Sequence, residues 1–225
     1  MKIRFLGHAC FELTDGDTRL LVDPFLTGNP KAAVEASDLE PTHILLTHGH
    51  ADHLGDTVDI AKRAGAQVIA IVELANEIGE AGVENVVDPN IGGTVEFPGG
   101  WVRLTPAWHT AVSPNGTPHT PAGLVINLGG KTVYHLGDTG LFSDLALPGK
   151  RDSLDVAIVP VGGHYTMDRH DAVEAVKLVG APTVIPCHYD TFPPIETDDE
   201  AFKSDVEGGT PSTVTILQPG EEIEL

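Results

Sequence analysis

The most constraining feature of the sequence is a histidine-rich segment, Thr47–His53, which directly follows the short apolar run His43–Leu46. Its potential metal ligands are His48, His50, Asp52 and His53. Imidazole and carboxylate groups both bind divalent cations near neutral pH, and side chains packed this closely would repel one another or lie unused without one. A solvated polar turn is the alternative. We therefore expect a strand to end here and a metal site to begin.

The spacing of these residues indicates how they can be divided between two metal ions. On an extended or turning backbone, residues two apart project to the same side, so His48 and His50 can hold one ion. Asp52 and His53 lie where the chain turns toward the predicted helix Thr57–Ala64, and they can face a second ion.

Three further candidates each follow a predicted strand. His109 follows Val102–Pro106, Asp138 follows Thr132–His135, and His188 follows Thr183–Pro186. Strand ends in a layered fold meet at one edge, where ligand sites are usually built. We therefore expect these three residues to join the histidine-rich segment in one site.

The order of the predicted elements favours two sheets packed face to face with helices outside. Short strands and hairpins recur in both halves, for example around Gly129-Gly130. Helices are expected at Thr57–Ala64, Glu73–Glu80, Asp168–Val179 and Asp198–Glu207, a loop at His109–Pro121, and closing strands at Val214–Leu217 and Glu222–Leu225. A single doubly wound sheet is the competing arrangement. No linker or repeat divides the chain, so residues 1–225 are expected to form one domain.

Charge and composition narrow the partners. The chain has 33 acidic and 13 basic residues, a net charge of −20, and its basic residues form no cluster. Such a field repels nucleic acid, so we expect a small-molecule substrate and no nucleic-acid partner. Small anionic substrates are not excluded by the charge, because bound metals dominate the electrostatic field at their site. Self-association into a homo-oligomer also stays open.

The sequence shows no sign of export or membrane insertion. No apolar run approaches the ~20 residues that cross a bilayer, and the opening residues are typical of a strand rather than a signal peptide. Only two cysteines are present, too few for a secreted disulfide scaffold. We therefore expect a cytoplasmic protein with no membrane partner.

Residues His48–His53 resemble the H-x-H-x-D-H signature of the metallo-β-lactamase superfamily, and His109, Asp138 and His188 match its later ligand motifs in order. Asp23-Pro24 resembles the early strand-end aspartate of that superfamily. Leu6–Phe11 resembles a subset, the short metal-dependent hydrolases near the ascorbate-phosphate lactonases and the N-acylethanolamine phospholipase D group. The resemblance implies a four-layer αββα sandwich.

The resemblance also implies a dinuclear site. The ligands of the first metal would be His48, His50 and His109, and those of the second would be Asp52, His53 and His188. Asp138 would bridge the two ions. Zinc is the first expectation, with manganese, nickel or iron as alternatives. Related oxygen-reducing di-iron enzymes have Glu where this chain has His50, so the resemblance favours hydrolysis by a metal-activated hydroxide.

Several further residues are candidates for roles beside the metal ligands. Asp52 is a candidate to orient or accept a proton as well as to bind metal. His8 is a candidate for substrate contact or proton donation, with a structural role as the alternative. Asp23 either holds a ligand histidine in its tautomer or caps a turn. His164 is a candidate for substrate contact, with an approach to the following helix as the alternative. His119 lies in a loop that can close over substrate.

The leading hypothesis is therefore a metal-dependent hydrolase of a small ester-like substrate. The substrate is either a phosphodiester or phosphate ester, or a lactone or similar carbonyl compound. Two alternatives come from other classes: a non-catalytic metal-binding regulatory module, and a di-iron oxidoreductase that reduces oxygen or nitric oxide.

Overall fold

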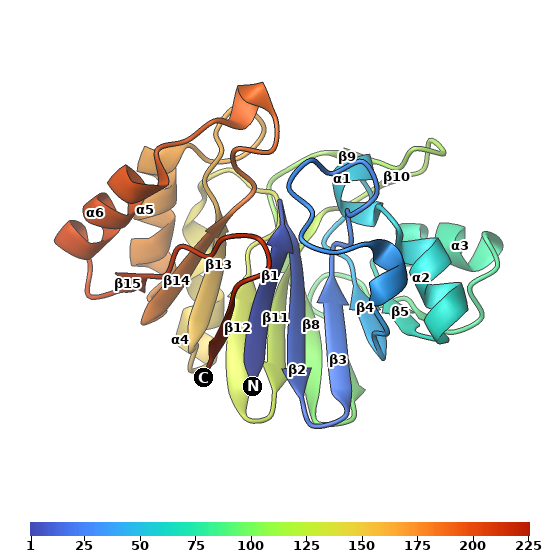
Figure 1. Cartoon of the computed structure of the whole chain (residues 1–225). Coiled ribbons are helices and arrows are strands. Elements are labelled where there is room, and N and C mark those ends of the chain that lie inside the picture. The colour runs from blue at the N-terminus through green and yellow to red at the C-terminus, as the bar shows by residue number, and fades with distance from the viewer.

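Two seven-stranded sheets face each other in the computed structural model, which describes residues 1–225 (Figure 1). The first sheet has the order β16-β1-β2-β3-β4-β5-β6. Its strands are β1 Lys2–Gly7, β2 Cys10–Asp15, β3 Thr18–Val22, β4 His43–Leu45, β5 Gln67–Ile69, β6 Val86–Val87 and β16 Glu222–Glu224. Strands β1 to β3 form an antiparallel meander, and β3 to β6 are parallel.

The second sheet has the order β15-β14-β13-β12-β11-β8-β7. Its strands are β7 Thr94–Phe97, β8 Gly100–Pro106, β11 Ala122–Leu128, β12 Lys131–His135, β13 Val156–Pro160, β14 Thr183–Cys187 and β15 Thr213–Val214. The strands from β7 to β12 are antiparallel, and those from β12 to β15 are parallel. Each sheet therefore joins an antiparallel part to a parallel part.

Helices cover the outer face of each sheet. The helices are α1 Ala51–Leu54, α2 Thr57–Ala64, α3 Val72–Glu80, α4 Ala146–Arg151, α5 Arg169–Val179 and α6 Asp199–Gly209, with short 3₁₀ turns at Ala36–Asp38, Ser143–Leu145 and Pro193–Ile195. In Figure 1, α2 and α3 lie beside the first sheet and α4, α5 and α6 beside the second. The predicted four-layer αββα sandwich is confirmed. None of these helices combines the length and the apolar character that a bilayer span requires.

Two apolar cores hold the layers together. The larger has 38 buried residues, including Phe11, Ile44 and Leu124, and fills the space between the sheets and under α2 and α3. The smaller has 18, including Val125 and Phe202, and joins the second sheet to its helices. Alternating side chains of β11 therefore serve both cores, as expected for a strand that is covered on both faces.

Strand direction decides where the functional loops lie. Within the first sheet β1, β3 and β4 run the same way, because two antiparallel steps separate β1 from β3. Within the second sheet β8, β12, β13 and β14 likewise run the same way. The loops that follow these strands meet at one rim of the sandwich, where parallel strand ends usually form a ligand site.

Three segments differ most from the predicted secondary structure. The predicted loop His109–Pro121 contains a small hairpin, β9 Ala111–Val112 paired with β10 Pro118–His119. Helix α4 was not predicted because Pro148 and Gly149 have low helix propensity, which packing against α5 overrides. The predicted strand Val214–Leu217 shortens to β15, which pairs with β14 through only two residues.

Candidate metal centre

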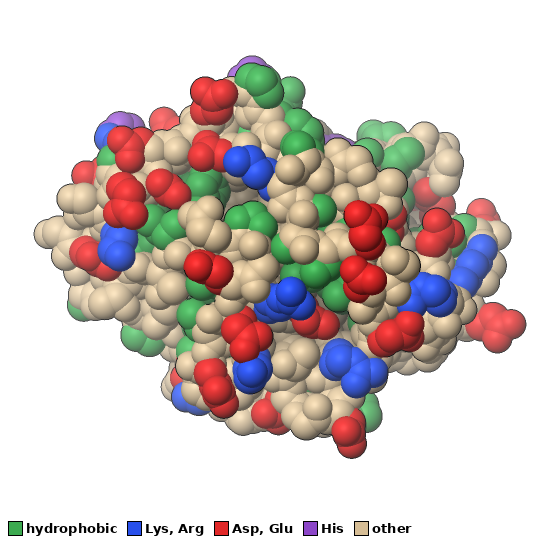
Figure 2. Space-filling model, viewed as in Figure 1, with side chains coloured by type: hydrophobic (Ala, Val, Ile, Leu, Met, Phe, Trp, Pro, Cys, Tyr) green, Lys and Arg blue, Asp and Glu red, His purple; other side chains and the backbone are tan.

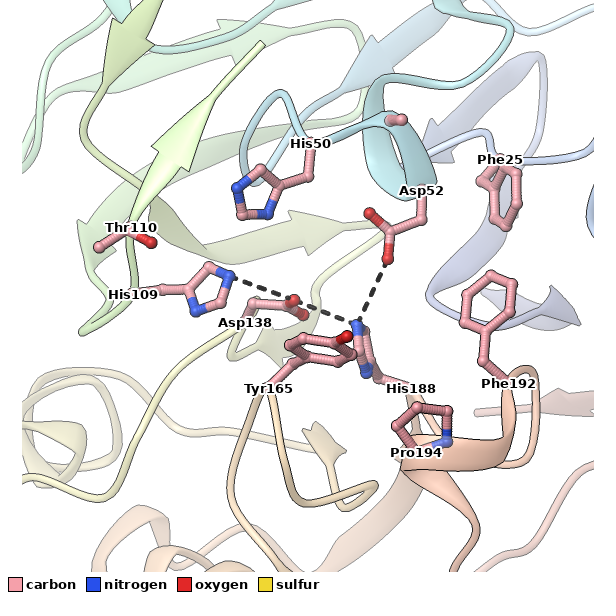
Figure 3. A pocket seen from close by; sticks show the side chains of 11 residues that line it. Phe25, His50, Asp52, His109, Thr110, Asp138, Tyr165, His188, Phe192 and Pro194 are labelled. Carbon is pink, nitrogen blue, oxygen red and sulfur yellow. Dashed lines mark ion pairs between the residues drawn. The ribbon is translucent and has the colours of Figure 1, made fainter. Parts of the chain in front are cut away.

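The seven predicted ligands converge at this rim around the carboxylate of Asp138. Its Oδ2 atom lies 3.1 Å from His188 Nε2, 3.4 Å from His53 Nε2, 3.7 Å from His109 Nε2 and 3.9 Å from His48 Nε2. Asp138 follows β12, whereas its neighbours come from loops of both sheets. One carboxylate oxygen therefore faces imidazoles from four separate positions. Figure 3 shows His109 and His188 joined to Asp138 by dashed lines.

The first ligand group consists of His48, His50 and His109, whose ligand atoms all lie within 4.8 Å of one another. His48 Nε2 and His50 Nδ1 are 2.9 Å apart. Nitrogens bound about 2.0–2.1 Å from one tetrahedral zinc ion are about 3.3 Å from each other. The spacing is therefore close to that of two ligands that share an ion.

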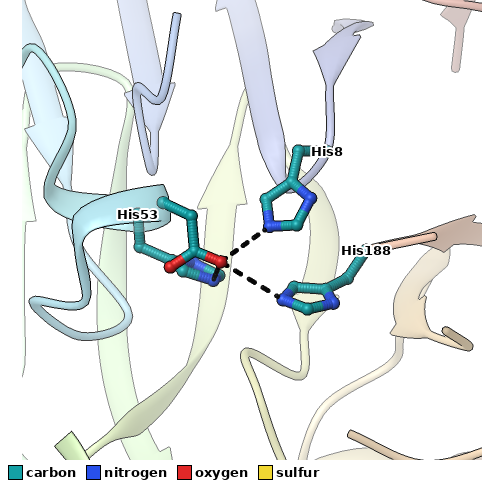
Figure 4. Close-up of side chains that lie close together, drawn as sticks. His8, His53 and His188 are labelled. Carbon is teal, nitrogen blue, oxygen red and sulfur yellow. Dashed lines mark hydrogen bonds and ion pairs between the residues drawn. The ribbon is translucent and has the colours of Figure 1, made fainter. Parts of the chain in front are cut away.

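The second ligand group consists of Asp52, His53 and His188, with His8 packed beside them (Figure 4). Asp52 Oδ2 lies 3.1 Å from His8 Nε2, 3.8 Å from His188 Nε2 and 4.0 Å from His53 Nε2. The sequence prediction placed Asp52, His53 and His188 together here, and the structure adds His8 to them.

Unpaired nitrogens show that this cluster fits a cation. His53 Nε2 and His188 Nε2 are buried and make no hydrogen bond. A buried polar atom without a partner is costly, and a cation between these nitrogens and Asp138 would satisfy both. The residues present therefore fit a metal site.

The electrostatics of the cluster agree with cation binding. Burial lowers the pKa values of His48, His50 and His109, which keeps their imidazoles neutral as metal ligands must be. Burial opposes the charged form of His53, but Asp138 and Asp23 outweigh it and raise the pKa of His53 well above its ordinary value. The region between these carboxylates thus favours positive charge.

Asp23 fixes the tautomers of two ligands at once. It is fully buried at the end of β3, and its Oδ1 accepts the Thr47 backbone N–H at 2.8 Å. Its Oδ2 accepts the Thr47 hydroxyl at 2.6 Å and His53 Nδ1–H at 2.8 Å. The Thr47 oxygen in turn accepts His48 Nδ1–H at 3.1 Å. Because a carboxylate only accepts, both histidines carry their proton on Nδ1 and leave Nε2 free for a metal.

His8 lies behind Asp52. It is buried, and its Nε2–H donates to Asp52 Oδ2 while Nδ1, 2.8 Å from Thr191 Oγ1, accepts the hydroxyl proton. Burial lowers the pKa of His8 to about 4, so the ring is neutral at pH 7. The hydrogen bond from His8 orients Asp52 directly. Contact between His8 and a substrate stays a prediction.

His119 contacts the ligand loop rather than open space. Its Nδ1–H donates to Thr117 O at 3.0 Å, so Nε2 is free to accept the Gly49 backbone N–H at 2.8 Å. The hairpin that carries His119 is fixed to α3, where Ser113 Oγ donates to Glu77 at 2.6 Å. His119 therefore holds the backbone between His48 and His50.

We expect His119→Ala to weaken metal affinity about tenfold, because the ligand loop loses this hydrogen bond, with His119→Gln recovering part of the loss. Competition with a chromophoric chelator measures the change. His164→Ala is the matched control, since His164 is exposed on a different loop. Equal metal affinity in wild type and His119→Ala would show that His119 does not support the ligand loop.

The cavity beside the cluster has a volume of about 500 Å³. The ligands that line it are His50, Asp52, His109, Asp138 and His188, and the other lining residues are Phe25, Ala51, Thr110, Tyr165, Phe192 and Pro194. His164 is exposed and does not line the cavity, whereas its neighbour Tyr165 does. Substrate contact by His164 therefore stays a prediction. Sequence reasoning missed Tyr165, although it lies in the same glycine-rich loop.

Backbone strain is concentrated at the ends of the strands that carry the site. Non-glycine residues with positive φ are His8, Asp23, His164, His188 and Asp190. Such conformations are uncommon and are retained mainly at functional sites. The strain lets a strand turn sharply and present its next side chain to the rim.

Comparison with known proteins gives consistent matches. The Beta-lactamase superfamily domain matches residues 2–188. A UPF0173 metal-dependent hydrolase of Pelotomaculum thermopropionicum is 47% identical, with 100% of both chains covered. A protein of the same name from Thermus thermophilus is 45% identical, over 100% of this chain and 99% of that protein. The solved structure of Igni18, a metallo hydrolase from Ignicoccus hospitalis, superposes with a TM-score of 0.90 at 36% identity and covers 99% of this chain and 97% of that one.

The fold, the histidine and aspartate cluster and these matches define a class, the metal-dependent hydrolases built on two facing sheets. The chain belongs to the β-lactamase superfamily. The resemblance inferred from the sequence is thereby confirmed.

Proposed function

We propose that the chain hydrolyses a small ester-like substrate at a dinuclear metal centre. The observation that carries this proposal is the position of Asp138 Oδ2, which lies within 4 Å of histidines from both ligand groups. In the proposal, His48, His50 and His109 hold one ion. Asp52, His53 and His188 hold the other, and Asp138 contacts both.

Each residue has a separate task in the reaction. Divalent ions here would lower the pKa of a water molecule to about 7 and so supply hydroxide at neutral pH. Zinc suits the imidazole and carboxylate donors best, with manganese, nickel and iron as alternatives. Asp52 lines the cavity and is positioned to accept a proton, while the hydrogen bond from His8 fixes its orientation.

Metal removal tests the catalytic proposal. We expect a chelator to reduce hydrolysis at least a hundredfold, and added zinc to restore it, in a panel of acyl esters, lactones and bis-p-nitrophenyl phosphate.

Asp52→Asn should lower kcat by about a hundredfold or more, because general acid–base groups accelerate a reaction by about 10²–10⁴. A metal-loaded wild type without turnover of any substrate would instead favour a regulatory metal-binding module.

Elemental analysis separates the redox alternative. A di-iron oxidoreductase would be purified with iron in both positions and would reduce oxygen or nitric oxide with a flavin partner. The hydrolase proposal expects ester hydrolysis with zinc alone. Turnover that requires iron and an electron donor would contradict it.

A further inference from the structure

The cavity beside the metal cluster also bears on the substrate, and this inference rests on the proposed function. We propose that the substrate is an uncharged carboxylic ester or lactone with an apolar group, rather than a phosphate ester. Hydrolysis adds the water oxygen to the carbonyl carbon and breaks its C–O bond to the alcohol oxygen. The alcohol takes one water proton, and the acid product releases the other.

Phe25 and Phe192 form an aromatic wall of the cavity beside the candidate ligand Asp52. The rings of Phe25 and Phe192 are 6.3 Å apart between centroids, and they lie side by side beyond Asp52 in Figure 3. Both pack against the buried ring of His8, with centroid distances of 5.8 Å and 5.7 Å. Because His8 is fixed by two hydrogen bonds, this wall is fixed in relation to Asp52.

The rest of the cavity beyond the ligands is also largely apolar. Ala51, Tyr165 and Pro194 continue the surface from the aromatic wall. Tyr165 is 54% exposed, so its ring stands at the mouth rather than inside the core. A cavity of about 500 Å³ lies in the range that binds small organic ligands, which usually have apolar linings.

The cavity lacks a positive side chain to pair with a phosphate. Its lining contains no Lys or Arg, and its only carboxylates are the ligands Asp52 and Asp138. Proteins that bind phosphate usually supply Arg or Lys donors. Bound metals polarise whichever atom is attacked, carbonyl or phosphoryl, so they do not separate the two classes. The surface beyond the metals separates them, because it offers apolar contact and no compensating charge.

The overall charge of the protein also favours an uncharged substrate. The net charge of −20 repels anions at a distance from the site, although bound metals would dominate the field at the site itself. Figure 2 shows acidic side chains spread over the viewed face with fewer basic ones among them. An uncharged substrate approaches without this penalty.

Matched p-nitrophenyl compounds test the inference, because the leaving group is constant. The probes are the acetate, butyrate and hexanoate esters, p-nitrophenyl phosphate and bis-p-nitrophenyl phosphate, with wild-type enzyme loaded with zinc. We expect kcat/KM to rise about fourfold for each added methylene, which corresponds to about 0.8 kcal/mol. We expect both phosphate esters to be hydrolysed at least a hundredfold less efficiently than the hexanoate.

Variants of the aromatic wall identify the surface responsible. Phe192→Ala should raise KM for the hexanoate at least tenfold and should flatten the rise of kcat/KM from the acetate to the hexanoate. Tyr165→Ala, at an exposed position, should act in the same direction by a smaller factor. Leu178→Ala is the matched control, because Leu178 is 38% exposed on α5 and does not line the cavity.

The outcomes distinguish this inference from the proposed function. Faster turnover of a phosphate ester than of the hexanoate would overturn the substrate class and leave the hydrolase proposal intact. An unchanged chain-length dependence in both Phe192→Ala and Tyr165→Ala would overturn the role of the wall. No turnover of any ester, lactone or phosphate would overturn both proposals.

Discussion

Asp138→Asn is expected to lower kcat/KM by about a thousandfold and to reduce the metal content of the protein by at least one ion per chain. The variant keeps the shape of the side chain but removes the charge that faces four histidine nitrogens. Burial acts against ionisation of Asp138, yet His188 and His53 hold its pKa well below the ordinary range. In the proposed centre Asp138 is therefore a charged ligand that faces both ligand groups.

Steady-state kinetics and elemental analysis on the same preparation measure this effect. Asp17→Asn is the control, because Asp17 is exposed in a turn far from the rim. Full metal content together with activity near that of wild type in Asp138→Asn would show that Asp138 does not bind metal.

Asp23→Asn is expected to weaken binding of both metals about a hundredfold while leaving the metal-free fold nearly as stable as wild type. Asparagine has the same shape and tolerates the positive φ of 45° at this position. The NH₂ group of the asparagine donates hydrogen bonds at the position where Oδ2 of Asp23 accepts them. His53 Nδ1 and the Thr47 oxygen must then accept, and the Thr47 hydroxyl is left to donate to His48 Nδ1. Both histidines therefore carry their proton on Nε2, which removes the lone pairs that face the metals.

Asp23→Ala provides the contrast. It removes the acceptor entirely and leaves buried donors of Thr47 and His53 unpaired, so the free energy of unfolding should fall by about 3–5 kcal/mol. Urea denaturation of the metal-free variants, with chelator competition on the loaded ones, separates the two effects. Tight metal binding in Asp23→Asn would contradict control of the tautomers by Asp23.

The candidate metal ligands could be predicted from the sequence because their signal is local. Four of them lie within His48–His53, and the others directly follow apolar strands whose parallel ends meet at one rim. Asp23 was also accessible as a candidate to hold a ligand histidine, and the structure confirms this contact with His53. The sequence could not show that the same carboxylate also reaches His48 through Thr47.

Long-range contacts account for what was missed. His119 lies 70 residues from Gly49, and its hydrogen bond depends on a hairpin too short to show a strand pattern. Phe25 and Phe192 come from opposite ends of the chain, and nothing in either local sequence indicates that their rings meet. Substrate-facing residues are thus harder to predict than ligands, because van der Waals contact has no fixed sequence spacing.

The metal content of the wild-type chain tests the central claim most directly. The protein is saturated with zinc, freed of unbound metal by gel filtration and analysed for zinc and protein concentration. Asp138 and the two ligand groups predict two ions per chain. One ion or none per chain at saturation would contradict a dinuclear centre.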